Sequence, residues 1–287
     1  MLPNSEIEEN WSLVIEPQRN LLDLRLGELW RYKDLVLLFV QRDFVSTYKQ
    51  TILGPIWYLI QPLLTTITFT VIFGNIASLP TDGLPQFLFY MSGTVVWAYF
   101  ADCLNKTSNT FVNNASLFGK VYFPRLAVPV SILISSLVTF LIQFGMFLLF
   151  VMYFALRGTQ IQGNWLWIFL SPLLVAVMAG LGLGFGIIIS SLTTKYRDLR
   201  FLVTFGVQLM MYATPVIYPV SSIPQRYQWL IQINPMTPII EGFRLAFLGT
   251  GTVDMAHLLY SAGFMLVVVL LGTIIFNRVE QTFMDTV

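Results

Sequence analysis

Six long runs without a charged residue cover most of this chain, and shorter connections that contain the charges separate them. The runs are residues 56–77, 86–101, 126–156, 158–194, 201–225 and 255–277. A helix needs about 20 apolar residues to cross the hydrocarbon core of a membrane. Five runs reach that length, and the second needs residues 102–104 to complete it. The apolar residues are continuous rather than alternating, which favours helices over the strands of a β-barrel. We therefore predict an all-α integral membrane protein with six transmembrane helices.

The basic residues predict how these helices are oriented. Thirteen of the 16 Lys and Arg residues lie before the first run, after the last, or in the second and fourth connections. Because basic residues are retained on the cytoplasmic side, we expect both termini in the cytoplasm. Composition agrees with the class, since 56% of the residues are hydrophobic and 11% are charged. The expected parts are a cytoplasmic tail at 1–27, an interface helix at 28–54, the six-helix domain at 55–280 and a cytoplasmic end at 281–287.

The segment 28–54 mixes charged residues with bulky apolar ones. On a helix, Arg31, Arg42 and Lys49 fall on one line, and Val36, Val40 and Phe44 lie on the opposite side. Gly54 and Pro55 then end the helix before the first run. This pattern predicts an amphipathic helix sunk into the membrane interface. It is either a surface anchor or the wall of a lateral entrance for an amphiphilic substrate. The residues assigned to it are Arg31, Arg42, Asp43, Tyr48 and Lys49.

The connection at 102–125 is too long for a tight turn. Ser108 suits a helix N-cap, Gly119 suits a helix C-terminus, and Phe111 and Phe118 fall on one face between them. The pattern predicts a short amphipathic helix. The connection is either a loop that only sets topology or a rigid element that receives a partner. The shorter connection at 193–200 has the same two interpretations. The candidate contact residues are Phe111, Phe118, Lys120, Arg125, Tyr196, Arg197 and Asp198.

The last external connection, at 220–254, is semi-polar and rich in proline. Pro238 follows Thr237 as in a helix start, and Glu241 and Arg244 form an i,i+3 pair on that helix. Residues 227–233 can form a second short helix. Both are too short to span a membrane, so we predict re-entrant or interfacial helices. They are either an external cap or a gate, and the gate residues would be Asn234, Pro235, Glu241 and Arg244.

Chemistry-bearing motifs are few. The chain contains no Gly-x-x-x-x-Gly-Lys-Ser/Thr loop, so it cannot bind ATP in that way. The single Cys103 excludes an intramolecular disulfide and a cysteine-based metal site. We expect no catalytic set, metal or cofactor in this chain. Gly180, Gly182, Gly184 and Gly186 are interpreted as positions of close helix packing.

Four separated segments carry a resemblance to a known family. They are RDFVSTYKQTILGPIWYLIQP at 42–62, LFGKVYFPRLAVP at 117–129, YRDL at 196–199 and INPMTPIIEGFR at 233–244. Their residues and their order resemble the permease subunits of ABC-2-type polysaccharide exporters, which export O-antigen, capsule or teichoic-acid chains. The resemblance covers roughly residues 28–280.

The resemblance implies a homodimer with a channel along its axis, in a bacterial inner membrane. Two copies of a separate cytoplasmic ATPase would bind ATP and Mg and drive transport. The connection at 102–125 would dock on that ATPase, and the outer helices would gate the channel exit. The cargo would be a polysaccharide on a polyprenyl-pyrophosphate lipid. Membrane lipid is a further expected partner, and nucleic acid is not.

The first and fifth spans line the channel in that family. Aromatic faces hold sugars weakly by stacking, so we predict a substrate path along Tyr58, Trp57, Tyr212 and Tyr218. The alternative is that these residues form lipid-facing aromatic belts. Two other functions remain open: an ABC-2 exporter of small molecules or lipids, and a membrane enzyme acting on lipid-linked sugars. The enzyme would depend on Asp102, Asp198 or Glu241.

Overall fold

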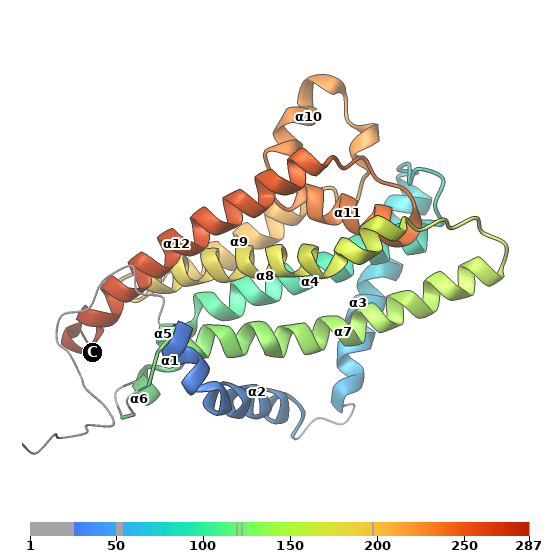
Figure 1. The fold of residues 1–287 in the computed structure, drawn as a ribbon. Helices are drawn as coiled ribbons and strands as arrows, with labels where there is room; N and C mark the ends of the chain where they lie inside the picture. The colour runs from blue at the N-terminus through green and yellow to red at the C-terminus, as the bar shows by residue number, and fades with distance from the viewer. Residues whose placement is uncertain (1–25, 50–53, 119, 122, 197, 287) are drawn as a thin grey trace, which may run out of the picture.

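The computed structural model describes residues 26–49, 54–118, 120–121, 123–196 and 198–286. For Leu26, Thr47, Tyr48, Pro55 and residues 280–286 it describes the backbone alone. Every regular element in the described residues is helical (Figure 1). The α-helices are α1 (Leu26–Arg31), α2 (Lys33–Tyr48), α3 (Trp57–Phe69), α4 (Gln86–Ser108), α5 (Thr110–Asn113), α6 (Ala115–Phe118), α7 (Ala127–Leu156), α8 (Trp165–Thr193), α9 (Leu199–Tyr212), α10 (Gln225–Gln232), α11 (Thr237–Leu248) and α12 (Met255–Thr286). The all-α prediction is confirmed.

Five helices in the described residues are long and apolar enough to cross a membrane. They are Trp57–Ile76, in which α3 continues as a π-helix, Gln86–Ser108, Ala127–Leu156, Trp165–Thr193 and Met255–Val279. The fifth predicted run does not form a helix of spanning length. In its place α9 ends at Tyr212, and irregular chain follows through Pro215. Proline has no backbone N–H and disfavours a helical residue before it, which explains the early end of α9.

Helix α8 lies between α4 and α12, and its glycines make this possible. A Cβ on Gly182 or Gly186 would lie 2.6 Å or 2.5 Å from a side-chain carbon of α4. A Cβ on Gly180 or Gly184 would instead meet Met265 or Val268 of α12 within 2.8 Å. Gly182 and Gly186 therefore allow the close approach of α4, and Gly180 and Gly184 allow that of α12. The predicted role of these glycines in close packing is confirmed.

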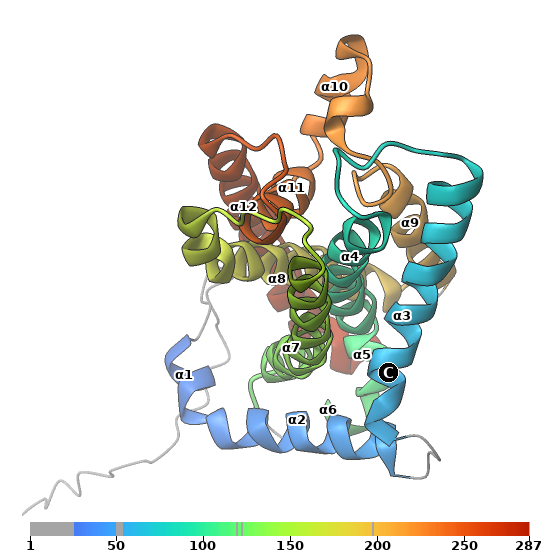
Figure 2. The same cartoon turned by 90° about the vertical axis from the view of Figure 1, so that its right-hand side faces the viewer.

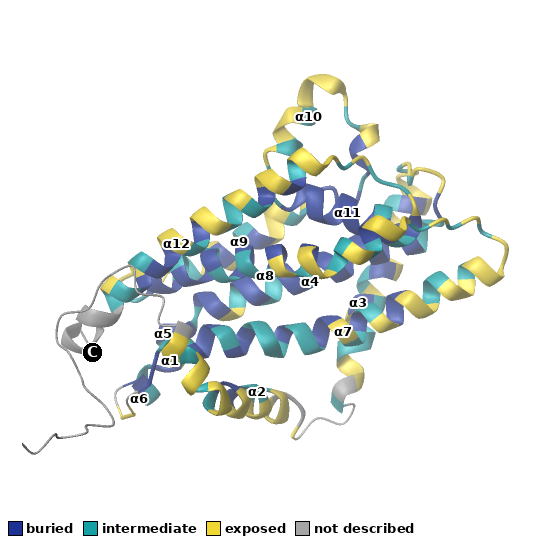
Figure 3. Ribbon diagram, in the orientation of Figure 1, coloured by how far each residue is buried: buried dark blue, intermediate teal, exposed yellow. Residues whose placement is uncertain are grey.

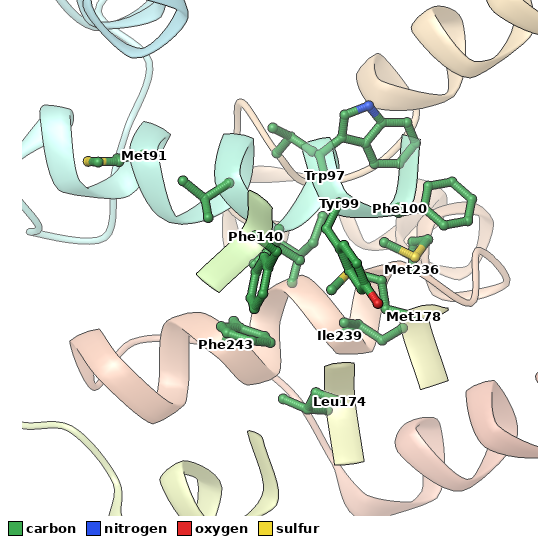
Figure 4. Close-up of a cluster of buried hydrophobic side chains, with 14 of the residues drawn as sticks. Met91, Trp97, Tyr99, Phe100, Phe140, Leu174, Met178, Met236, Ile239 and Phe243 are labelled. Carbon is green, nitrogen blue, oxygen red and sulfur yellow. The ribbon is translucent and has the colours of Figure 1, made fainter. Parts of the chain in front are cut away.

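The main core lies where α4, α7, α8 and α11 meet. Tyr99 of α4 packs against Phe140 of α7, with ring centroids 5.1 Å apart, and Phe243 of α11 meets Phe140 edge to face at 6.1 Å. Figure 4 shows these rings with Leu174 and Met178 of α8 beneath them. Helix α11, too short to span, is therefore as deeply buried as the spanning helices beside it (Figure 3).

The segment predicted as an interface helix forms two helices, α1 and α2. Helix α2 lies across one end of the molecule, at a steep angle to α3 (Figure 2). Val36 and Phe39 are buried, whereas Leu37 and Leu38 are exposed. The ring centroids of Phe39 and Phe123 lie 5.7 Å apart. An exposed apolar edge of this kind suits immersion in lipid. Of the assigned residues, Arg31, Arg42 and Lys49 are exposed, and the side chain of Tyr48 lies outside the described part.

Candidate functional site

A buried arginine organises the end of the molecule that we predicted to face outward. Arg244 of α11 is 1% exposed and donates hydrogen bonds to the carbonyl oxygens of Pro215 and Val216, at 2.6 and 2.7 Å. It also donates to Glu241 Oε1 at 3.0 Å, and its guanidinium lies 3.8 Å from the centroid of the Phe89 ring. Burial lowers the pKa of Arg244, and the Glu241 carboxylate acts in the opposite direction. We call these five residues the outer clamp.

The outer clamp explains how the chain after α9 can leave the helical path. Backbone carbonyls released from a helix inside an apolar environment need another hydrogen-bond donor. Arg244 supplies it to Pro215 and Val216, while Glu241 Oε2 accepts from the backbone N–H of Thr252 at 3.0 Å. The predicted ion pair of Glu241 and Arg244 is confirmed, but it is buried. Sequence reasoning missed the two carbonyls, because the partners are 28 and 29 residues apart in the chain.

The other predicted gate residues brace the same region. Asn234 donates from its side chain to Thr214 Oγ1 at 2.8 Å and accepts from the backbone N–H of Met236 at 3.0 Å. The carbonyl of Pro235 accepts from Ser261 of α12 at 2.8 Å. Helix α10 projects from this region and has no buried residue (Figure 3). Both predicted short helices therefore form, one exposed and one buried.

Two adjoining cavities lie at the opposite end, where α2, α3, α4 and α7 meet. Their volumes are about 330 and 660 Å³, and both are lined by Tyr58, Lys106 and Thr139. We call the two cavities together the inner groove. Its polar lining comes from α3, α4, α7, the rim on α2, and α5 with its two flanking residues. It comprises Arg42, Asp43, Ser46, Tyr58, Gln61, Thr65, Thr94, Asp102, Asn105, Lys106, Asn109, Asn113, Asn114, Ser135, Ser136, Thr139 and Gln143.

The charges of the inner groove are paired within the protein. Lys106 Nζ lies 2.8 Å from Asp102 Oδ2, and Arg42 Nη2 lies 2.8 Å from Asp43 Oδ1. Several uncharged groups have no partner: the hydroxyls of Ser135 and Ser136 and the amide oxygen of Asn105 are buried without a hydrogen bond. The groove is thus neutral overall and able to accept and donate further hydrogen bonds.

A sequence signal for the groove exists, although it was not used in the prediction. Within the apolar runs, polar residues recur every three or four positions, which places them on one helix face. Helix α7 has Ser135, Thr139 and Gln143 in this spacing. Helix α3 repeats it with Tyr58, Gln61 and Thr65, and α4 has Thr94, Asp102 and Lys106 on one face at spacings of eight and four residues. Only the packing of the three helices turns these faces toward one space.

The predicted substrate path is not one continuous row of residues. Tyr58 lines both cavities of the groove, and the adjacent Trp57 is half exposed. Tyr212 is 46% exposed, and Tyr218 donates its hydroxyl proton to the Tyr212 carbonyl at 2.9 Å. Neither Tyr212 nor Tyr218 lines the groove. The structure therefore separates Tyr58 from the other pair, and their joint role stays a prediction.

The connection at 102–125 differs from its prediction in form and in orientation. Ser108 is the last residue of α4 and not an N-cap, and two single-turn helices, α5 and α6, follow it. Phe111 and Phe118 are 0% and 4% exposed, and Phe111 stacks on Phe276 of α12 at 4.6 Å. These rings face the bundle because burying them there removes apolar surface from water. The predicted direct contact of the Phe111 and Phe118 rings with a partner is therefore wrong for this structure, because both rings are buried.

The remaining contact candidates lie at the surface of the same end. Lys120, Tyr196 and Asp198 are exposed, and the Arg125 guanidinium lies 5.4 Å from the centroid of the Phe118 ring. Arg197 and the predicted stop Gly119 lie outside the described residues. Thr193 Oγ1 donates to the Ser108 carbonyl at 3.2 Å, and the Phe111 N–H donates to Ser190 Oγ at 3.2 Å. The hairpin of α5 and α6 is thus fixed to α8, and its polar side is turned away from the bundle.

Comparison with known proteins assigns this arrangement to a family. Residues 34–248 match the ABC-2 type transporter family, which is three quarters of the chain. The chain belongs to this family. Similar proteins include an O-antigen export system permease protein RfbA of Klebsiella pneumoniae, 29% identical over 88% of this chain and 94% of that protein. An RfbA of Myxococcus xanthus is 24% identical over 91% and 98%, and the Escherichia coli polysialic acid transport protein KpsM is 23% identical over 85% and 93%.

As an ABC-2 transporter with several apolar helices, the chain is a multi-pass membrane protein and a transport component. Among the described residues, no group of three or more His, Cys, Asp or Glu could hold a metal ion. The acidic residues that an enzyme would need are also separated in this fold. Asp102 pairs with Lys106, Glu241 is held in the outer clamp, and Asp198 is exposed.

Proposed function

We propose that this chain is the permease of an ATP-driven exporter that moves a lipid-linked polysaccharide from the cytoplasm to the outer face of the inner membrane. The observation that carries the proposal is the match to O-antigen export permeases over nearly the whole of both chains. We propose further that two copies of the chain form the channel and that two copies of a separate ATPase drive it. Both termini and the inner groove would then face the cytoplasm.

Deletion of the chain in its native host tests this function. Surface polysaccharide should disappear while the lipid-linked polymer accumulates inside the cell, and expression of the intact chain should restore export. Surface labelling with a lectin or antibody, and extraction of the intracellular glycan, measure the two pools. Unchanged surface polysaccharide in the deletion strain would overturn the proposal and would favour an exporter of small molecules or lipids.

The partner ATPase would bind the exposed side of the hairpin formed by α5 and α6. This side carries Ser116 and Lys120, which are both exposed and lie outside the inner groove. Substitution Ser116→Trp should reduce the amount of ATPase that co-purifies with the tagged chain from native membranes. Gln160→Trp, in an exposed loop between α7 and α8 at the other end of the bundle, is the matched control. Equal recovery of ATPase with both variants would remove the hairpin from the interface.

The aromatic path is tested by changing its two separated parts in turn. If Tyr58 and the pair Tyr212 and Tyr218 both contact the polymer, Ala at either part should lower surface polysaccharide at normal membrane levels, and the triple variant should lower it most. Trp165→Ala is the control, because Trp165 is 83% exposed at the start of α8 and lies outside the path. Full export by a well-expressed triple variant would assign the tyrosines to a lipid-facing belt.

A further inference from the structure

The inner groove is unusual because it is polar within helices that are otherwise apolar. It reaches from Ser46 at its rim on α2 to Thr94, Thr65 and Gln143, which lie near the middle of α4, α3 and α7. Polar groups inside a membrane protein are costly unless they face a partner, a cavity or water. Their alignment on three helices therefore marks a space that holds water or a polar ligand.

The groove also has the size and the unpaired groups of a ligand site. Its cavities of about 330 and 660 Å³ lie within the range of roughly 300–1,000 Å³ that small-molecule sites occupy. Ser136 is 1% exposed and lines the smaller cavity, while Ser135 and Asn105 line the larger. Each of them has a buried oxygen without a hydrogen-bond partner. A buried polar group usually has a partner, so a ligand or ordered water is expected here.

The charges indicate which class of ligand fits. Lys106 and Arg42 are each paired with a carboxylate at 2.8 Å, so the described lining of the groove has no surplus cation with which to neutralise a phosphate or pyrophosphate. What remains are hydroxyls, side-chain amides and the rings of Tyr58 and Trp97. Such groups suit a neutral ligand with many hydroxyls and apolar ring faces, because they offer both hydrogen bonds and stacking.

We propose that the inner groove binds sugar residues of the exported polymer, within a single copy of the chain. This proposal rests on the proposed function and names a second location for the substrate, apart from a channel between two copies. The sugars would enter along α2 and lie between α3 and α7, while their lipid anchor stays in the surrounding membrane. The exposed Leu37 and Leu38 on α2 place apolar surface beside that route.

Site-specific photocrosslinking in the native host tests what occupies the groove. A photoreactive amino acid replaces Ser46, at the rim of the larger cavity, or Leu38, which is exposed on the same helix but outside the groove. After irradiation, radiolabelled sugar on the purified chain reports glycan, and radiolabelled glycerol reports phospholipid. We expect glycan at position 46 and only phospholipid at position 38. Phospholipid alone at both positions, or glycan equally at both, would overturn the proposal.

A pair of matched threonines tests whether the groove matters for transport. Thr139 and Thr273 are both buried, and each donates its hydroxyl proton to the carbonyl four residues earlier, at 3.4 and 2.8 Å. Only Thr139 lines the groove. Loss of one hydrogen bond to the sugar in Thr139→Val should reduce surface polysaccharide about two- to tenfold, and Thr273→Val should not reduce it.

The outcomes of the two threonine variants separate this proposal from the proposed function. Normal export by Thr139→Val at normal membrane levels, in a host where deletion of the chain abolishes export, would overturn the groove as a sugar site and leave the permease function intact. If Thr139→Val is poorly expressed, Ser136→Ala provides the second measurement, because the Ser136 hydroxyl loses only a weak contact with the Cys103 thiol. Normal export by that variant would have the same meaning.

Discussion

The outer clamp and the inner groove both place polar side chains inside an apolar protein, but they satisfy them in different ways. At the outer clamp, the Arg244 guanidinium has four hydrogen-bond acceptors from three separate segments of the chain. In the inner groove, Ser135, Ser136 and Asn105 have buried oxygens without any partner. Saturated groups hold a fold in place, whereas unsaturated groups are available to a ligand. The comparison therefore supports a structural role for the outer clamp and the binding role that we propose for the inner groove.

The largest expected effect comes from removing the centre of the clamp. Arg244→Met should destabilise the protein by about 3–5 kcal/mol, because Glu241 and two carbonyls would stay buried without their partner. Thermal unfolding of the purified chain in detergent measures it. Arg226→Met is the control, since Arg226 is exposed on α10. A clamp variant as stable as the control would contradict the structural role of the outer end.

A smaller loss is expected from crowding the clamp without removing a charge. A Cβ on Gly93 of α4 would lie 2.7 Å from the Val216 carbonyl oxygen and 3.1 Å from Arg244 Nη2. Gly93→Ala should therefore cost about 1–3 kcal/mol, as is typical of an overpacked core. Gly145→Ala on α7 is the control, because nothing lies within 4 Å of its added Cβ. Equal unfolding temperatures for the two variants would show that the clamp can relax.

The inner end allows a direct comparison of a partnered with an unpartnered serine. Ser190→Ala should destabilise by about 1–3 kcal/mol, because the backbone N–H of Phe111 loses its acceptor. Ser136→Ala should change stability by less than about 0.5 kcal/mol, because only a weak contact with the Cys103 thiol is lost. Chemical denaturation in detergent can resolve the difference. A Ser136 variant as unstable as the Ser190 variant would show that the groove is structural.

A small effect is also expected from an ion pair in the groove. Asp102 and Lys106 are both more than two fifths exposed, so Lys106→Met should alter stability by less than about 1 kcal/mol. The lost pair would leave the Asp102 carboxylate to bind a cation from solvent. A loss comparable with that of Arg244→Met would mean that the charges of the two regions have the same structural importance. Unfolding midpoints measured side by side decide between the two.

Much of the fold could be predicted from local pattern. The long apolar runs became spanning helices, Pro238 marked the start of α11, and the glycines of α8 marked its close neighbours. These predictions succeeded because the length of an apolar run, a cap residue and the absence of a Cβ act locally. The prediction of a spanning helix was wrong for the fifth run, because α9 ends at Tyr212 although the uncharged residues continue to position 225.

The sequence by itself determined the class of this protein, because a continuous apolar run has no stable place except a membrane or a core. Only the tertiary structure decided what its polar residues do. Phe111 packs inward against Phe276 of α12, and Phe118 packs beside Phe111. Arg244 donates a hydrogen bond to a carbonyl 28 residues away in the chain. The polar faces of α3, α4 and α7 formed one groove only when the helices packed together. Partners of this kind are fixed by contacts between distant segments, and no local pattern encodes them.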